Sequence, residues 1–157
     1  MRTADKIRVG SATVRIKTMR LTILTLAHHV YSSEPGNLLN ITGIYTGITT
    51  PIFPFVTPRI LLVARFTGSP AEYGREFEVM VTFADEDGLP GPIPSDHKTE
   101  RMTVGQSGED VHCIYTLEAL DTKFTKPGWY QFFIHVDGEL IEELPVNVSL
   151  SVKRALI

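Results

Sequence analysis

The chain of 157 residues has one cysteine and therefore cannot close an internal disulfide. Cys113 lies in a run of alternating apolar and polar residues, which predicts a small buried hydrophobe rather than a reactive thiol. His112 precedes it, but adjacent residues of a strand point to opposite faces, so this imidazole is not placed to activate the sulfur. A thiol nucleophile is therefore not expected.

Long apolar runs are also missing. The longest candidate, residues 21–27, is interrupted by Thr22 and Thr25 and is far shorter than the ~18 residues of a membrane helix. The first twenty residues lack the uninterrupted apolar core and the small-residue cleavage site of a signal peptide. Together with the lone thiol, these absences predict a cytoplasmic protein that has no membrane partner.

The sequence contains none of the common loops that bind phosphate or carry a nucleophile, and it has no H-x-H pair. His28 and His29 are the most tempting metal ligands, but neighbours on a strand face opposite ways. Asp85–Gly88 resembles the start of a calcium loop, yet its twelfth position is Asp96 instead of Glu, and a turn is predicted. No catalytic residue, cofactor-binding residue or metal ligand is assigned, and no cofactor is expected.

Charge is spread unevenly along the chain. Residues 1–20 hold six Lys or Arg and one Asp, whereas the rest holds nine Lys or Arg and seventeen Asp or Glu. The acidic body argues against a nucleic-acid partner. The basic extension can dock on anionic partners, fold onto the body, or precede a natural start at Met19. We expect a natural start at Met19, because the regular pattern begins only at Leu21. Residues 1–20 are then a basic extension that is disordered or that results from a misplaced start site.

Period-two alternation dominates the remainder. One residue set alternates clearly with its polar neighbours: Phe77, Val79, Val81 and Phe83. About eight such short strands, with turn signals every ~8–12 residues, predict an all-β, antiparallel two-sheet sandwich, immunoglobulin-like or a related Greek key. A closed barrel is the alternative, because it has the same period. We expect a single domain over residues 21–152, with a tail at 153–157.

Four local features are predicted from residue chemistry. Residues 49–58 hold three prolines and should form a crossover loop. The polar segment Lys98–Val104 should be an edge strand. Tyr130 follows the Pro127-Gly128 bend and should bond its hydroxyl to nearby backbone as a tyrosine corner. Asp137-Gly138 should form a tight hairpin.

Phe53 and Phe55 are the candidate binding residues. They lie on a proline-stiffened loop, residues 51–58. Two rings on such a loop can form an apolar patch for a partner, and the stiffness leaves little entropy to lose on binding. They can also cap the open end of the sandwich. We favour the cap, because monomers rarely expose such rings.

A set of short motifs is spread over most of the chain, at residues 39–45, 52–55, 61–66, 127–132 and 136–139. On these motifs, the chain over about residues 19–148 resembles a bacterial β-sandwich family classed as a domain of unknown function. The family usually has a lysine-type residue after the first-turn glycine, where this chain has Asn37-Leu38. The resemblance implies a compact sandwich with no catalytic residue to carry over, and it supports Met19 as the natural start.

These observations favour a non-enzymatic interaction module that binds a protein partner, or a second copy of itself, through a sheet edge, a sheet face or a loop. The alternative is a small ligand-binding or hydrolytic domain whose site lies in the loops at one end of the sandwich. A third hypothesis is a structural component associated with phage or defence systems.

Overall fold

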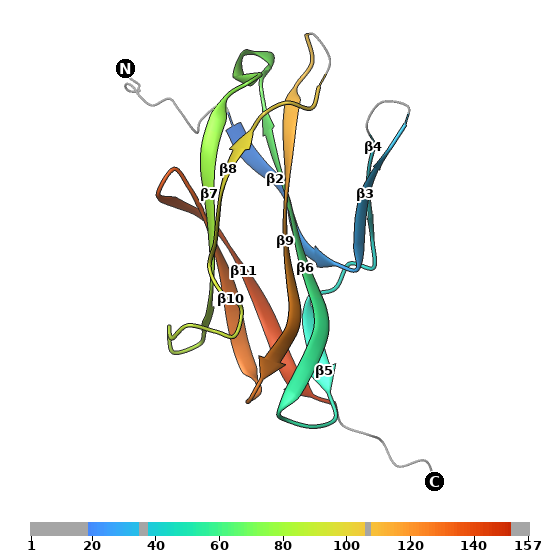
Figure 1. The fold of residues 1–157 in the computed structure, drawn as a ribbon, viewed down its shortest axis with the longest axis vertical. Coiled ribbons are helices and arrows are strands. Elements are labelled where there is room, and N and C mark those ends of the chain that lie inside the picture. Colours follow the sequence, from blue (N-terminus) through green and yellow to red (C-terminus); the bar gives the residue numbers. More distant parts are fainter. Residues whose placement is uncertain (1–18, 35–37, 106–107, 152–157) are drawn as a thin grey trace. The chain divides into compact units, whose positions relative to one another are not determined.

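The computed structural model describes residues 19–34, 38–105 and 108–151 (Figure 1). The expected extension, apart from Met19 and Arg20, and the expected tail at 153–157 lie outside these residues. The described residues contain no α-helix, and a 3₁₀ turn spans Pro70–Glu72. Ten strands are found in them: β2 (Met19–Ala27), β3 (His29–Ser33), β4 (Leu38–Thr42), β5 (Gly47–Thr50), β6 (Phe55–Gly68), β7 (Glu76–Asp85), β8 (Asp96–Arg101), β9 (Val111–Phe124), β10 (Gly128–Val136) and β11 (Glu139–Leu150).

These strands form three sheets. The first has five strands in the order β5-β11-β10-β7-β8, the second has the order β2-β6-β9, and the third pairs β3 with β4. β10 runs antiparallel to both β7 and β11, whereas β5 runs parallel to β11. The predicted all-β class is confirmed.

The predicted number of strands, about eight, was too low, because two segments that read as single strands, residues 21–31 and 38–48, are each divided in two. Residues 21–31 break at His28, whose N–H donates to the carbonyl oxygens of Thr42 and Gly43 at 3.0 and 3.1 Å. Gly43 has a φ of +70°, and a Cβ there would lie 2.7 Å from Nδ1 of His28. A glycine is thus required where the imidazole packs on the backbone, and β4 ends beside it.

Proline positions account for two further differences. Only residues 51–54 separate β5 from β6, so the predicted loop at 49–58 is shorter than expected and Pro58 lies near the start of β6. β11 continues through Pro145 as one strand. β5 pairs with β11 only from Asn147 onward, so β11 is an edge at Pro145, where the missing N–H has no partner to lose.

The described residues divide into two compact units, each built from three segments. Unit 1 takes the residues up to 24 together with 64–77 and 100–115, and unit 2 takes 25–63, 78–99 and the residues from 116 onward. In unit 1, the rings of Phe66 and Phe77 meet edge-on at 5.2 Å. In unit 2, Phe83 stacks on Tyr130 at 5.5 Å and meets Phe124 edge-on at 6.3 Å. Strands of the five-stranded and three-stranded sheets therefore pack together within each unit. The single domain over residues 21–152 stays a prediction.

The local predictions from turn chemistry are confirmed. The hydroxyl of Tyr130 donates to the carbonyl oxygen of Lys126 at 2.9 Å. Asp137 and Gly138 have φ values of +49° and +84°, as a two-residue hairpin between β10 and β11 requires. Oδ1 of Asp85 accepts the N–H groups of Asp87 and Leu89 at 3.0 and 2.9 Å, so this segment is a turn.

The alternating set of β7 is buried as predicted, since Phe77, Val79, Val81 and Phe83 are each at most 4% exposed. The polar segment predicted as an edge strand over Lys98–Val104 forms β8, which begins two residues earlier and ends three residues earlier than expected. It does lie at the edge of its sheet.

Candidate functional site

Phe53 and Phe55, the binding residues suggested by the sequence, are both half-buried. Their neighbours Ile52 and Val56 are 64% and 49% exposed. The aliphatic side chains of this loop thus face solvent more than its rings do. Whether the rings serve as a cap or as a patch stays a prediction.

His28 and Cys113 both pack against neighbouring side chains. The His28 ring packs against that of Tyr45 at 5.2 Å. Cys113 is 4% exposed, and its Sγ lies 3.7 Å from Oε1 of Glu100. Burial, followed by the charge of Glu100, raises the pKa of Cys113 to about 12. The described part of the chain holds no group of three or more His, Cys, Asp or Glu suited to a metal ion.

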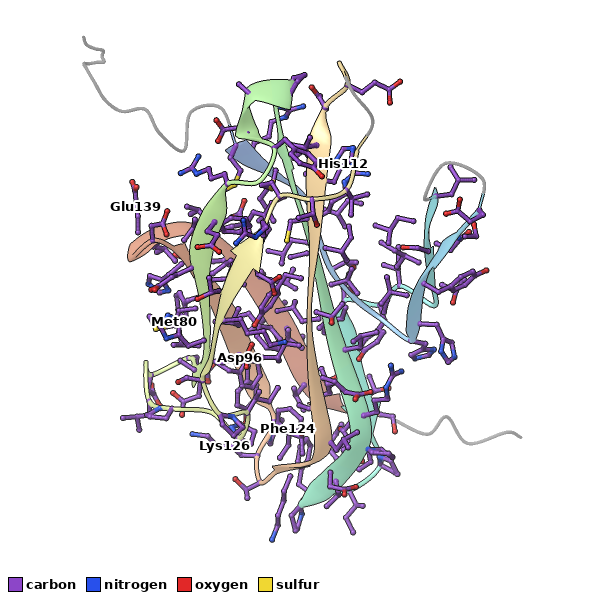
Figure 2. All side chains as sticks on the ribbon, turned by 45° about the horizontal axis from the view of Figure 1, so that its top comes forward. Met80, Asp96, His112, Phe124, Lys126 and Glu139 are labelled. Carbon is purple, nitrogen blue, oxygen red and sulfur yellow. The ribbon has the colours of Figure 1, made fainter. Side chains whose placement is uncertain are left out.

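A network of polar side chains crosses unit 1. Oγ1 of Thr67 lies 2.8 Å from Oγ1 of Thr22 and 3.0 Å from Nδ1 of His112, and Nε of Arg65 donates to Thr22 at 3.0 Å. His112, labelled in Figure 2, lies on β9. Burial, then the charge of Arg65, lowers the pKa of His112, so the imidazole stays neutral at pH 7. The network joins three strands by side-chain hydrogen bonds, and none of those described for the imidazole comes from a carboxylate. The charge of Asp110 acts on His112 and partly offsets the lowering of its pKa.

A hollow of unit 2 lies between β8 and β9. It has a volume of about 670 Å³ and is lined by residues 92–96, Lys98 and residues 116–122. β8 ends the five-stranded sheet and β9 ends the three-stranded sheet, so two sheet edges border it (Figure 1). Asp96, labelled in Figure 2, begins β8 at this border. We call this hollow the edge groove.

The backbone of β9 faces into the edge groove at every second residue. Nζ of Lys98 donates to the carbonyl oxygen of Thr116 at 3.0 Å, which fixes the direction of that carbonyl. Along a strand, the N–H and C=O of one residue point to the same side, and those of the next point to the other. Glu118 and Leu120 therefore direct their backbone groups into the edge groove as well. Leu117 and Ala119, buried between them, direct theirs to the opposite side.

A second hollow, of about 360 Å³, lies beside Trp129 in unit 2. The Trp129 side chain is 53% exposed, and Phe133 and Pro145 line the same hollow. In the β10–β11 register Gln131 is opposite Pro145 and Phe133 is opposite Glu143, so these side chains share one face of the sheet. That face is the opposite one from Tyr130 and Phe132, which are buried.

Neither hollow was predicted from the sequence. The residue pattern of β10 indicates the hollow beside Trp129, whereas no residue pattern indicates the edge groove. The alternation that buries Tyr130 and Phe132 also places Trp129, Gln131 and Phe133 together on the other face, so an aromatic row was predictable. The edge groove depends on which strands end the sheets, and no local pattern carries that information.

Comparisons with known proteins add the family and little else. No curated protein matches this chain. Two solved structures resemble it weakly: an alkylpurine DNA glycosylase from Pseudomonas fluorescens bound to DNA containing an abasic site analogue, at 13% identity and a TM-score of 0.43, and a β-glucosidase from Listeria innocua in complex with isofagomine, at 10% identity and a TM-score of 0.46. The matches cover 84% and 83% of this chain but only 30% and 16% of those two proteins.

No helix in the described segments is long and apolar enough to cross a membrane. A family model matches residues 22–149, nearly the whole span that the sequence resemblance covered. On that match the chain belongs to DUF6941, a family of unknown function.

Proposed function

We propose that this protein is an interaction module that binds an extended segment of a partner protein as an added strand in the edge groove. The observation that carries the proposal is the groove itself. In it the outer edge of β9 presents the backbone of Glu118 and Leu120 and the N–H of Thr116, whose carbonyl oxygen accepts from Lys98. A strand edge with unpaired N–H and C=O groups is a template for another chain. Strand addition uses such an edge for affinity and the neighbouring side-chain pockets for specificity.

The charges at the groove indicate the chemistry of the partner. Asp96, Glu118 and Asp121 contribute three carboxylates to its lining, against the single ammonium of Lys98. Lys98 lies 3.7 Å from Asp96, and Arg59 from outside the lining pairs with Glu118. Asp121 has no basic partner among the contacts described for it. A segment that carries Lys or Arg complements this lining, and the apolar floor of Ile93, Leu117 and Ala119 accepts its alternate side chains.

The proposal extends to the arrangement of the sheets and to the cellular location. We propose a two-sheet, immunoglobulin-like or Greek-key sandwich, which is supported by the tyrosine corner at Tyr130 and by the packing of Phe83 against Phe124. We also propose a bacterial family that works in the cytoplasm, where an unpaired thiol such as Cys113 stays reduced. The protein is proposed to lack enzymatic activity.

The test uses amide hydrogen exchange and an edge-blocking variant. An alternating Lys/Val/Thr heptapeptide is added to the ¹⁵N-labelled protein. The amides of Glu118 and Leu120 should gain protection and shift, whereas the amide of Leu117, directed to the other side of β9, should not change. Glu118→Pro removes an N–H that no strand of the sheet uses, so it should abolish binding while the fold is retained.

Glu118→Ala is the matched control, because it removes the carboxylate and keeps the N–H group. It should bind the peptide more weakly than the native protein but still gain protection at Leu120. Equal binding by the proline and alanine variants contradicts strand addition. Protection that appears without peptide and rises with protein concentration would identify a second copy of this chain as the occupant instead.

A further inference from the structure

The hollow beside Trp129 combines an exposed aromatic face with carboxylates. Trp129 is the one tryptophan of the chain, and its side chain is 53% exposed. Asp85, which ends β7, and Glu86, which follows it, complete the lining on one side, while Phe133 and Pro145 contribute apolar surface. The hollow is built entirely from residues of unit 2.

Glu86 is held against the backbone beside the tryptophan. Its Oε1 accepts the N–H of Trp129 at 3.4 Å. Gly128 has a φ of +149°, and a Cβ at that position would lie 3.4 Å from Oε2 of Glu86. The glycine thus lets the carboxylate approach the chain closely. No protein hydrogen bond is described for Oε2, which leaves this oxygen available to a ligand.

Asp85, in contrast, is occupied by the turn. Its Oδ1 accepts two backbone N–H groups, and its Oδ2 lies 3.7 Å from Nζ of Lys126, which is labelled in Figure 2. Glu86 is therefore the carboxylate of the hollow that can pair with something new. The pKa of Tyr130 is raised by burial and then by Asp85 and Glu86, in agreement with negative potential at this end of the sheet.

The negative surface continues along the same face. A neighbouring hollow shares Gln131 and Pro145 with the first. It is also lined by Glu143, which lies on the same face, and by Glu142, which the register places opposite Ile134. Lys126 is the only ammonium or guanidinium group that the described contacts place beside these four carboxylates. A neutral ligand such as a sugar gains nothing from this excess, whereas a cation is attracted by both the carboxylates and the face of the indole.

We propose that the hollow beside Trp129 binds the guanidinium group of an arginine side chain from a partner protein, stacked on the indole and paired with Glu86. Arginine fits better than lysine because its planar group stacks on aromatic faces and presents two parallel donors to a carboxylate. The site lies on a different surface from the edge groove and does not depend on it. Loss of one site leaves the other intact, so the two proposals fail separately.

Trp129 provides its own reporter, because no other tryptophan contributes to the emission. Acetyl-Gly-Arg-Gly-amide is titrated into the 157-residue chain, with the citrulline, lysine and uncharged glycine analogues in parallel. We expect a saturable change in tryptophan emission with the arginine peptide and a weaker response to lysine. We expect none with citrulline, which keeps the shape and loses the charge. High salt should weaken the arginine response, since both partners are exposed to solvent.

The matched variants are Glu86→Gln and Glu139→Gln. Glutamine at position 86 can still accept the Trp129 N–H, so the turn is preserved, while the dissociation constant for the arginine peptide should rise about tenfold. Glu139, labelled in Figure 2, begins β11 at the end of the β10–β11 pair that lies away from Trp129. Glu139→Gln should therefore change the dissociation constant less than about twofold. Trp129→Leu removes the reporter, so its binding is measured by calorimetry, and it should no longer bind the arginine peptide. Calorimetry also shows whether the change in emission reflects binding.

Three results would overturn this proposal. The first is equal affinity for the arginine and citrulline peptides, and the second is an unchanged dissociation constant in a folded Glu86→Gln protein. The third is a saturable response to a neutral glycoside, such as methyl glucoside, without one to arginine, which would identify the hollow as a carbohydrate site instead.

Discussion

Replacing Tyr130 by Phe removes a single oxygen atom from a ring that otherwise keeps its place. The ring is 4% exposed, stacks on Phe83 at 5.5 Å and meets Phe124 edge-on at 5.2 Å. Phenylalanine retains all of these ring contacts. Only the hydrogen bond from the hydroxyl to the carbonyl oxygen of Lys126 is lost, so Tyr130→Phe isolates the bond that ties the β9–β10 connection to β10.

The expected loss follows from the setting of the two partners. An intramolecular hydrogen bond contributes about 0.5–1.5 kcal/mol net, and an acceptor left unpaired in the interior costs about 1–3 kcal/mol. Lys126 is exposed, so water can reach its carbonyl oxygen and the smaller figure applies. We expect Tyr130→Phe to lower the free energy of unfolding by about 1 kcal/mol, which corresponds to about 2–4 °C in Tm for a chain of this length.

Urea denaturation, followed by Trp129 emission and by far-ultraviolet circular dichroism, measures this difference. Tyr73→Phe is the matched control, because Tyr73 is 63% exposed. Removal of its hydroxyl group should change the free energy of unfolding by less than about 0.5 kcal/mol. Tyr130→Leu removes the ring and should cost about 2–4 kcal/mol. If Tyr130→Phe has the same urea midpoint as the native protein while Tyr130→Leu is destabilised, the ring alone matters and the argument from the hydroxyl is refuted.

Three further predictions concern a histidine, a thiol and a hairpin. Because the fold lowers the pKa of His112 below its usual value near ~6.5, the unfolded chain binds the extra proton more readily. Stability should therefore fall as the pH drops through about 6.5 and below, and His112→Gln should flatten that part of a urea-midpoint profile; a profile that is the same in both proteins contradicts this. Cys113, whose pKa is raised to about 12, should resist a thiol reagent at pH 8 in the native protein and react fully in urea, whereas equal rates would show that it is accessible. Gly138→Ala should lower the free energy of unfolding by about 1–2 kcal/mol through backbone strain alone, because φ is +84° and no atom lies within 4 Å of the added Cβ; an unchanged melting curve would count against the hairpin geometry.

The sequence predicted the features that depend on neighbouring residues. The alternation of Phe77, Val79 and Val81 predicted the buried face of β7, because side chains of a strand point alternately to its two faces. Turn chemistry placed the hairpin at Asp137-Gly138 and the bend before Tyr130. These predictions needed no knowledge of which strand lies beside which.

The features that were missed depend on distant partners. The bend at His28 arises because its N–H pairs with the carbonyl groups of Thr42 and Gly43, and nothing in residues 21–31 reveals that pairing. Pro145 is tolerated inside β11 because β5, nearly a hundred positions earlier in the chain, pairs only from Asn147 onward. Of the two hollows, the one beside Trp129 left a local signal in the alternation of β10, but its carboxylates come from the last residue of β7 and the first residue after it.

By itself, the sequence determined that the chain is built of strands, where the tight turns at Asp85–Gly88 and Asp137-Gly138 lie, and which side chains of β7 and β10 point inward. These properties follow from residues close together in the chain. Only the tertiary structure decided that β8 and β9 end their sheets and that Glu86 lies beside Trp129. Many segments of this chain carry the same alternating pattern, so the pattern does not select among partners. Strand order is selected by contacts between residues far apart in the sequence, and both proposed binding surfaces depend on those contacts.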